Sequence, residues 1–256
     1  MDNKNRNYNI GILLKGPIEK FYQKNKVTKS NDVKIIREIA PINNYINFRK
    51  MQNIINSVCK IIIKDKGFGT GFFCFIPFPD NDNKIPALIT CNHILNENDI
   101  LKGNKINFLF GQSDSLNTIT IEESRKKFTH KELDFTIIEI KSDDNIDSNY
   151  FLEIDQIVLN NDNFYEYLKN SLFHFIGINY RKTIDITDCR LKEINNFHLY
   201  YYCSTNVGFS GAPLINLSNN KVIGINLGLL GESSNYNIGT IIKYIVKEFL
   251  KFYLKK

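Results

Sequence analysis

The residues best suited to covalent chemistry lie in one short stretch, Gly208-Phe-Ser210-Gly211. A serine flanked by glycines is typical of a tight turn that exposes its hydroxyl group and leaves backbone N–H groups unpaired. We expect the N–H groups of Gly208 and Ser210 to point into one small cavity and form an oxyanion hole. Serine and glycine also fill ordinary turns, so this interpretation needs support from elsewhere in the chain.

A serine hydroxyl attacks a carbonyl group only when a base removes its proton. Four histidines compete for this role. His130 is predicted in a charged turn, whereas His174 and His198 fall inside apolar strand patterns and read as core or surface residues. His93 closes a short buried strand that begins at Leu88, where a rigid element meets a loop, and loops of this kind commonly carry catalytic groups. His93 is therefore the candidate base.

A third group must fix the tautomer and orientation of that base. Asp134 stands immediately before the apolar run Phe135–Ile140, while Glu132 and the acidic segment Asp143–Asp147 are competitors. Asp134 gives the chain order His, Asp, Ser, which is one of several orders known for this constellation. Base and carboxylate would then lie in one half of the chain, the nucleophile in the other, and the site in the cleft between them.

Short runs rich in β-branched and aromatic residues predict many strands. A polar, acidic segment at Lys141–Asn149 separates two halves of similar size, giving an N-terminal extension over 1–57 and two β-domains over 58–145 and 146–256. Helical spacing of apolar residues is confined to 43–57 and 241–254. The fold class is therefore all-β, a pair of barrels with a helix at each end. The predicted strands cover 58–63, 72–76, 87–91, 105–110, 117–121, 135–140, 154–159, 172–178, 183–194, 197–202, 212–217 and 222–227.

Composition excludes several other classes. The 256 residues include 43% hydrophobic and 12% aromatic side chains, which excludes wholesale disorder. The net charge of +6 comes from scattered lysines with no basic stripe, so no nucleic-acid partner is expected. The first apolar run, Ile10–Leu14, is too short for a signal peptide or a membrane span. We expect an intracellular protein that does not contact membranes.

The five cysteines are odd in number and lack Cys-x-x-Cys spacing. Neither a zinc site nor a secreted disulfide framework is therefore expected. We interpret the cysteines as buried free thiols. The predicted chemistry needs no metal and no cofactor.

Five motifs occur in a familiar order: Gly69-Thr-Gly-Phe72, Leu88-Ile-Thr-Cys-Asn-His93-Ile, Leu133-Asp134-Phe-Thr-Ile-Ile, Gly208-Phe-Ser210-Gly-Ala-Pro213 and Val222-Ile-Gly-Ile-Asn226. With them the chain resembles the trypsin-like serine peptidases of the chymotrypsin fold, in particular the disulfide-poor bacterial branch. The resemblance implies two six-stranded Greek-key β-barrels. It also implies that His93 acts as general base and then acid, Asp134 orients it, Ser210 is the nucleophile, and the amides of Gly208 and Ser210 form the oxyanion hole.

Two positions, Phe209 and Asn226, depart from the family pattern, and a third, Ser204, bears on specificity. Phe209 stands where digestive members carry an aspartate that is paired with a new N-terminus on activation, so activation by that salt bridge is excluded. Ser204 stands where an acidic residue would select Arg or Lys. The second half also resembles glutamyl endopeptidases, with Thr205 at a pocket threonine, but Asn226 replaces their pocket histidine and supplies no positive charge. Ser204, Thr205 and Asn226 are the candidate substrate-binding residues, and the preferred side chain is either glutamate or a small or apolar residue.

The leading hypothesis is a serine endopeptidase that acts on proteins or peptides through an acyl-enzyme on Ser210. The main alternative is a catalytically silent, protein-binding module on the same fold, because fold does not fix function. A nucleic-acid-binding β-barrel is a third reading that rests only on net charge.

Overall fold

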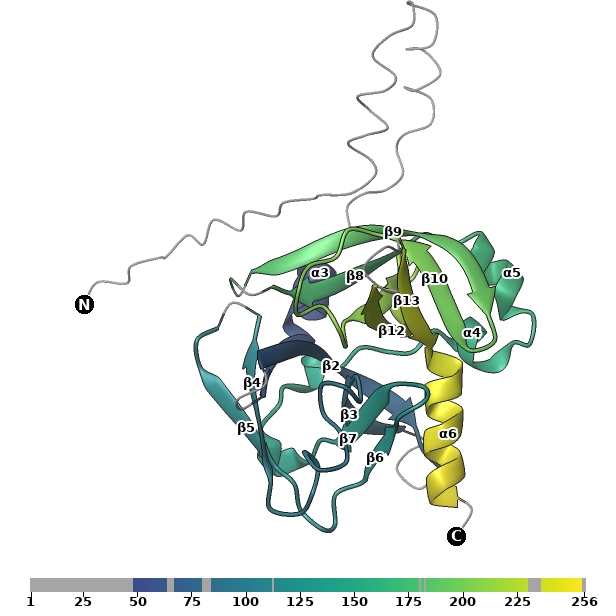
Figure 1. Ribbon diagram of the computed structural model, residues 1–256. Coiled ribbons are helices and arrows are strands. Elements are labelled where there is room, and N and C mark those ends of the chain that lie inside the picture. The colour runs from purple at the N-terminus through teal and green to yellow at the C-terminus, as the bar shows by residue number, and fades with distance from the viewer. Residues whose placement is uncertain are drawn as a thin grey trace, which may run out of the picture.

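The computed structural model describes residues 48–63, 67–79, 84–111, 113–179, 181, 183–229 and 236–254, with side chains from Gln52 onward (Figure 1). The expected N-terminal extension lies mostly outside the described residues. Its helix is present as α3 (Phe48–Asn56) and ends directly before the first strand.

The first half of the molecule is a seven-stranded antiparallel sheet in the order β5-β4-β1-β2-β3-β7-β6. Its strands combine β-branched and aromatic residues that fit a pleated, buried surface, and their apolar side chains make the core of this half. The strands are β1 (Val58–Ile63), β2 (Gly67–Pro77), β3 (Lys84–Thr90), β4 (Lys105–Phe110), β5 (Leu116–Thr120), β6 (Lys127–His130) and β7 (Phe135–Glu139).

The second half is a closed barrel in the cyclic order β10-β13-β12-β11-β8-β9. Every residue of β8 is buried, as expected for a strand that is covered on both faces. The strands are β8 (Phe173–Ile178), β9 (Ile184–Asn195), β10 (His198–Tyr202), β11 (Pro213–Asn216), β12 (Lys221–Leu229) and β13 (Asn237–Ile241). The all-β, chymotrypsin-like fold class is confirmed.

The first half departs from the expected closed six-stranded barrel. Its pairings repeat those of the second half, except that the strand needed for closure is divided between β5, which pairs with β4, and β6, which pairs with β7. The chain between β5 and β6 leaves the sheet at Arg125. The buried guanidinium group of Arg125 forms an ion pair with Asp144 at 2.6 Å and donates a hydrogen bond to the carbonyl oxygen of Glu139. A buried charge must keep such partners, so this segment cannot continue the ladder. β5 was predicted from the sequence, within a residue of its bounds, whereas β6 was not.

The connection between the halves holds four short helices: η1 (Ser142–Asp144), η2 (Ser148–Tyr150), α4 (Gln156–Asn160) and α5 (Phe164–Lys169). The strand predicted over 154–159 was wrong. Only Ile154 forms an isolated bridge, with Val222. Asp155 then caps α4, because its carboxylate accepts hydrogen bonds from the N–H groups of Ile157 and Val158.

The C-terminal helix α6 (Ile242–Leu254) continues directly from β13 and runs along the first half of the molecule (Figure 1). Phe249 is fully buried and contacts the rings of Phe78 and Phe128, both from the first half. The helix therefore ties the end of the second barrel to the first sheet. None of the helices among the described residues is long and apolar enough to cross a bilayer.

Candidate active site

Strand pairing brings His93 and Asp134 together. β3 and β7 run antiparallel with Thr90 opposite Thr136, so the residues just beyond these two strand ends lie on the same edge of the sheet. After β3 the chain makes one tight turn, in which the N–H of Leu95 donates to the carbonyl oxygen of Cys91 at 3.1 Å. The turn leaves His93 exposed at the surface.

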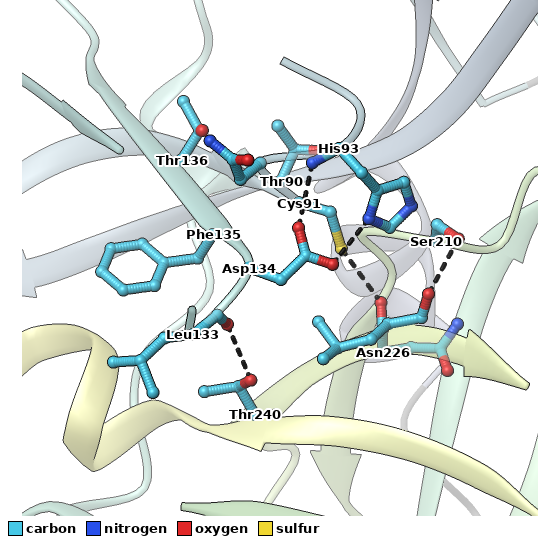
Figure 2. Close-up of polar contacts among 12 residues, drawn as sticks. Thr90, Cys91, His93, Leu133, Asp134, Phe135, Thr136, Ser210, Asn226 and Thr240 are labelled. Carbon is cyan, nitrogen blue, oxygen red and sulfur yellow. Dashed lines mark hydrogen bonds and ion pairs between the residues drawn. The ribbon is translucent and has the colours of Figure 1, made fainter. Parts of the chain in front are cut away.

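Asp134 contacts His93 through both carboxylate oxygens (Figure 2). Its Oδ2 atom lies 2.6 Å from Nδ1 of the imidazole ring, and its Oδ1 atom accepts the backbone N–H of His93 at 2.9 Å. The His93 side chain is 45% exposed and that of Asp134 is 22% exposed. With Nδ1 occupied by the carboxylate, Nε2 is left as the nitrogen that can accept a proton.

Asp134 is held in an uncommon backbone conformation. Its φ angle is +50°, in the left-handed region that aspartate tolerates better than most residues. The preceding carbonyl, that of Leu133, accepts a hydrogen bond from Oγ1 of Thr240 at 2.8 Å (Figure 2). Because Thr240 lies on β13, the second barrel helps to fix the turn that presents the carboxylate.

Ser210 lies in the loop between β10 and β11, directly after a turn of defined type formed by residues 206–209. The N–H of Phe209 donates to the carbonyl oxygen of Asn206 at 3.3 Å, and Gly208 has a φ angle of +98°. A positive φ at the third residue of a four-residue turn is the mark of a type II turn and favours glycine there. Types I and II differ in the orientation of the central peptide, so this geometry fixes the direction of the Gly208 N–H.

The three carbonyl groups of Gly208, Phe209 and Ser210 all accept hydrogen bonds from the protein. Their donors are Oγ1 of Thr70 at 2.7 Å, Nδ2 of Asn226 at 2.7 Å and the N–H of Thr70 at 2.9 Å, respectively. Within the described part of the chain, the N–H groups of Gly208 and Ser210 donate no hydrogen bond. These two amides are the donors that the sequence analysis expected in an oxyanion hole.

The Ser210 hydroxyl donates to the carbonyl oxygen of Leu227 at 3.0 Å (Figure 2). Among the described residues it makes no hydrogen bond with His93, although Figure 2 shows both side chains on the same side of the site. Sequence reasoning gave Leu227 no role, because a backbone carbonyl carries no sequence signature. Nucleophile–base hydrogen bonds often form only once a substrate is bound.

The three candidate substrate-binding residues have different surroundings. Ser204 is exposed, and Thr205 is half-buried with its hydroxyl 3.1 Å from Oδ1 of Asn237. Asn226 is fully buried: its Nδ2 donates to Phe209, and its Oδ1 accepts from the Tyr201 hydroxyl at 2.6 Å. Both ends of this amide are engaged inside the protein. Asn226 therefore holds the serine loop from inside the protein.

Phe209 anchors the loop by apolar contact where an aspartate would form an ion pair. Its side chain is 2% exposed, and its ring lies 5.1 Å from that of Phe175. A Cβ atom on Gly177 would lie 2.4 Å from the Phe209 ring, so this glycine makes room for the aromatic side chain. The loop is therefore fixed without a negatively charged side chain that could pair with a released N-terminus.

Cys91 completes a set of three metal-ligating side chains with His93 and Asp134. Their donor atoms lie within 4.8 Å of one another. The Cys91 thiol is fully buried and donates to the carbonyl oxygen of Asn226 at 3.4 Å. Burial, followed by the nearby charge of Asp134, raises the pKa of this thiol well above its usual value. Because metals bind the thiolate, these surroundings disfavour an ion here.

Comparisons with known proteins agree on the fold. No protein-family model matches the chain, and no curated protein matches its sequence. Among solved structures, the chain is similar to the Rv3671c protease of M. tuberculosis in its inactive form, with 17% identity over 83% of this chain and 96% of that one and a TM-score of 0.56.

Two further structures give similar values. Deg5 aligns with a TM-score of 0.57 and 16% identity over 84% of this chain and 98% of the other. The serine endoprotease of Yersinia pestis aligns with a TM-score of 0.56 and 13% identity over 80% of this chain and 66% of the other. The chain therefore has the fold of the trypsin-like serine peptidases, as its five motifs predicted.

Proposed function

We propose that this protein is a serine endopeptidase that cleaves proteins or peptides through an acyl-enzyme on Ser210. One observation carries the proposal. His93 is held by both oxygens of Asp134, beside a serine loop in which the carbonyl groups of residues 208–210 are bonded to protein, whereas the N–H groups of Gly208 and Ser210 have no partner among the described residues. Two N–H donors that are free to bind a ligand are what an oxyanion hole requires.

The proposed mechanism follows from these contacts. Substrate binding turns the Ser210 hydroxyl from the Leu227 carbonyl toward Nε2 of His93, which takes its proton as the oxygen attacks the scissile carbonyl. The Asp134 carboxylate stabilises the resulting imidazolium. The N–H groups of Gly208 and Ser210 bind the oxyanion. His93 then protonates the leaving amine, and a water molecule activated by His93 hydrolyses the acyl-enzyme.

For the residue on the acyl side of the scissile bond, we propose a small or apolar side chain. Ser204 gives no negative charge to attract Arg or Lys. Asn226 gives no positive charge for glutamate, and its amide is already engaged on both sides. Thr205 adds a hydroxyl group, and that hydroxyl is paired with Asn237.

The second candidate function is a protein-binding module without catalysis. The observation that favours it is the Ser210 hydroxyl, which bonds to Leu227 and not to His93. In this case the loop would be a rigid surface feature, and the serine would not react with electrophiles that require an activated hydroxyl.

Labelling with a fluorophosphonate probe distinguishes the two functions. We expect the wild-type protein to label covalently, Ser210→Ala not to label, and His93→Ala to label at least about 10³-fold more slowly, because nucleophile and base act as a unit. Circular dichroism should show that both variants keep the fold. Equal labelling of wild type and Ser210→Ala would place the reactive group elsewhere, and an inert wild type would favour the binding module.

A further inference from the structure

One residue of the first sheet contacts both residues that supply the proposed oxyanion hole. Thr70, on β2, donates from its hydroxyl to the carbonyl oxygen of Gly208 at 2.7 Å and from its backbone N–H to that of Ser210 at 2.9 Å. Gly208 and Ser210 belong to the second barrel. The two hydrogen bonds therefore cross from one half of the molecule to the other.

The direction of the hydroxyl bond is fixed by a third contact. Oγ1 of Thr70 lies 3.4 Å from the N–H of Ile178, at the end of β8. That N–H can only donate, so the hydroxyl accepts from Ile178 and its own proton goes to Gly208. Thr70 is fully buried, where a missing partner is costly because water cannot replace it.

The surrounding packing leaves Thr70 little freedom. Its carbonyl oxygen accepts the hydroxyl of Thr90 at 2.7 Å. The same oxygen would lie 2.0 Å from a Cβ atom on Gly211, whose φ angle is +90°. Strand β2 thus abuts the backbone of the serine loop, and only a glycine at position 211 permits the approach.

We propose that Thr70 is a positioning residue that holds Gly208 and Ser210 so that their N–H groups converge on the oxyanion. The inference rests on the proposed peptidase function. If Thr70 has this role, the geometry of the oxyanion hole depends on contact between the two halves of the molecule, made through the hydroxyl group of Thr70. Thr70 does not touch the reacting atoms. Its effect passes through the carbonyl of Gly208, which fixes the type II turn.

The test compares three substitutions. Thr70→Val keeps the shape but leaves Gly208 and Ile178 without the hydroxyl, whereas Thr70→Ser keeps the hydroxyl. Ser57→Ala is the control, because Ser57 is also buried and donates to a backbone carbonyl, that of Asn53, at 2.7 Å but away from the site. We expect Thr70→Val to lower the second-order rate constant of fluorophosphonate labelling at least about tenfold. Thr70→Ser and Ser57→Ala should stay within about threefold of wild type.

A second measurement does not require a reactive serine. Thr70→Val should increase hydrogen–deuterium exchange in a peptide covering 206–212, and Ser57→Ala should not, with both variants melting at similar temperatures. Unchanged labelling and unchanged exchange in Thr70→Val would overturn the positioning role. If the wild type is inert toward the probe, the peptidase proposal fails, and the exchange result alone decides whether Thr70 holds the loop.

Discussion

At the scale of single residues, the direction of a few backbone groups decides what the serine loop can do. Gly208 has the positive φ angle of a type II turn, and a Cβ atom there would lie 2.0 Å from Cε2 of Phe68. Conformation and space both demand glycine at this position. The peptide bond that precedes Gly208 has opposite orientations in type I and type II turns. A residue at this position that disfavours type II would therefore point its N–H away from the proposed oxyanion.

Gly208→Ala should therefore reduce fluorophosphonate labelling by about 10²-fold or more, the effect of losing one oxyanion donor. Gly103→Ala is the matched control, because Gly103 also has a positive φ angle, +86°, but no atom lies within 4 Å of an added Cβ. Both substitutions carry a backbone strain of about 1 kcal/mol, and Gly208→Ala adds the close contact with Phe68; urea unfolding reports the resulting loss of stability in each variant. Wild-type labelling by Gly208→Ala would show that this amide takes no part in the hole.

The sequence could identify these residues but not how each of them acts. Chain order and strand-end positions selected His93, Asp134 and Ser210 as candidates. The structure pairs His93 with Asp134, and the role of Ser210 stays a prediction. Asn226 was predicted to line the substrate pocket. No sequence pattern shows that its side-chain amide forms hydrogen bonds with Phe209 and Tyr201 inside the protein. Thr70 lay within a noted motif, but its hydroxyl bonds to a carbonyl group 138 residues away, and such a contact exists only in the folded chain.

At the scale of elements, prediction succeeded where one pattern ran without interruption. β4 and α6 were placed within a residue of their bounds, because each shows a sustained run or period of apolar residues. β6 was missed because its four half-buried residues, Lys127–His130, lack such a run. α4 was mistaken for a strand because Ile157, Val158 and Leu159 are typical of strands, while the capping effect of Asp155 decided the outcome.

β8 contains a buried histidine whose ionisation opposes folding. His174 is 1% exposed, its Nε2 atom has no hydrogen-bond partner among the residues that the structure describes, and burial lowers its pKa to about 4. The unfolded chain binds the proton near the ordinary histidine pKa of about 6.5, so below that pH protonation favours the unfolded state. Ionisation of His174 leaves the free energy of unfolding unchanged above about pH 6.5, lowers it as the pH falls from 6.5 to 4, and causes no further change below about pH 4.

Protonation of His174 should make the free energy of unfolding, measured with urea, about 2–3 kcal/mol lower at pH 4.5 than at pH 7.5. Each pKa unit corresponds to about 1.4 kcal/mol. His174→Gln cannot take up the proton, so its loss over the same interval should be smaller by that amount. Asp188, which lies opposite on β9 and whose pKa is raised by burial, contributes equally to both proteins. The same loss in both would assign the pH dependence to other groups.

At the scale of the whole molecule, the proposed site exists only where the two halves meet. The base and the carboxylate come from the first sheet and the serine from the second barrel. Contacts across the boundary include Thr70 to the serine loop and Thr240 to Leu133. Helix α6 adds a third tie away from the site, because the Tyr253 hydroxyl donates to the carbonyl oxygen of Lys127 at 2.8 Å and accepts its N–H at 2.7 Å.

Tyr253→Phe removes both hydrogen bonds to Lys127 while keeping the ring, and should lower the free energy of unfolding by about 1–3 kcal/mol. A protein of this size would then melt about 2–10 °C lower. Tyr165→Phe is the matched control, because the Tyr165 hydroxyl contacts Asn196 and Tyr244 within the second half alone. Only Tyr253→Phe should increase hydrogen–deuterium exchange in β6, where α6 meets the first sheet. Equal exchange in both variants would mean that α6 stabilises its own barrel and not the contact between the halves.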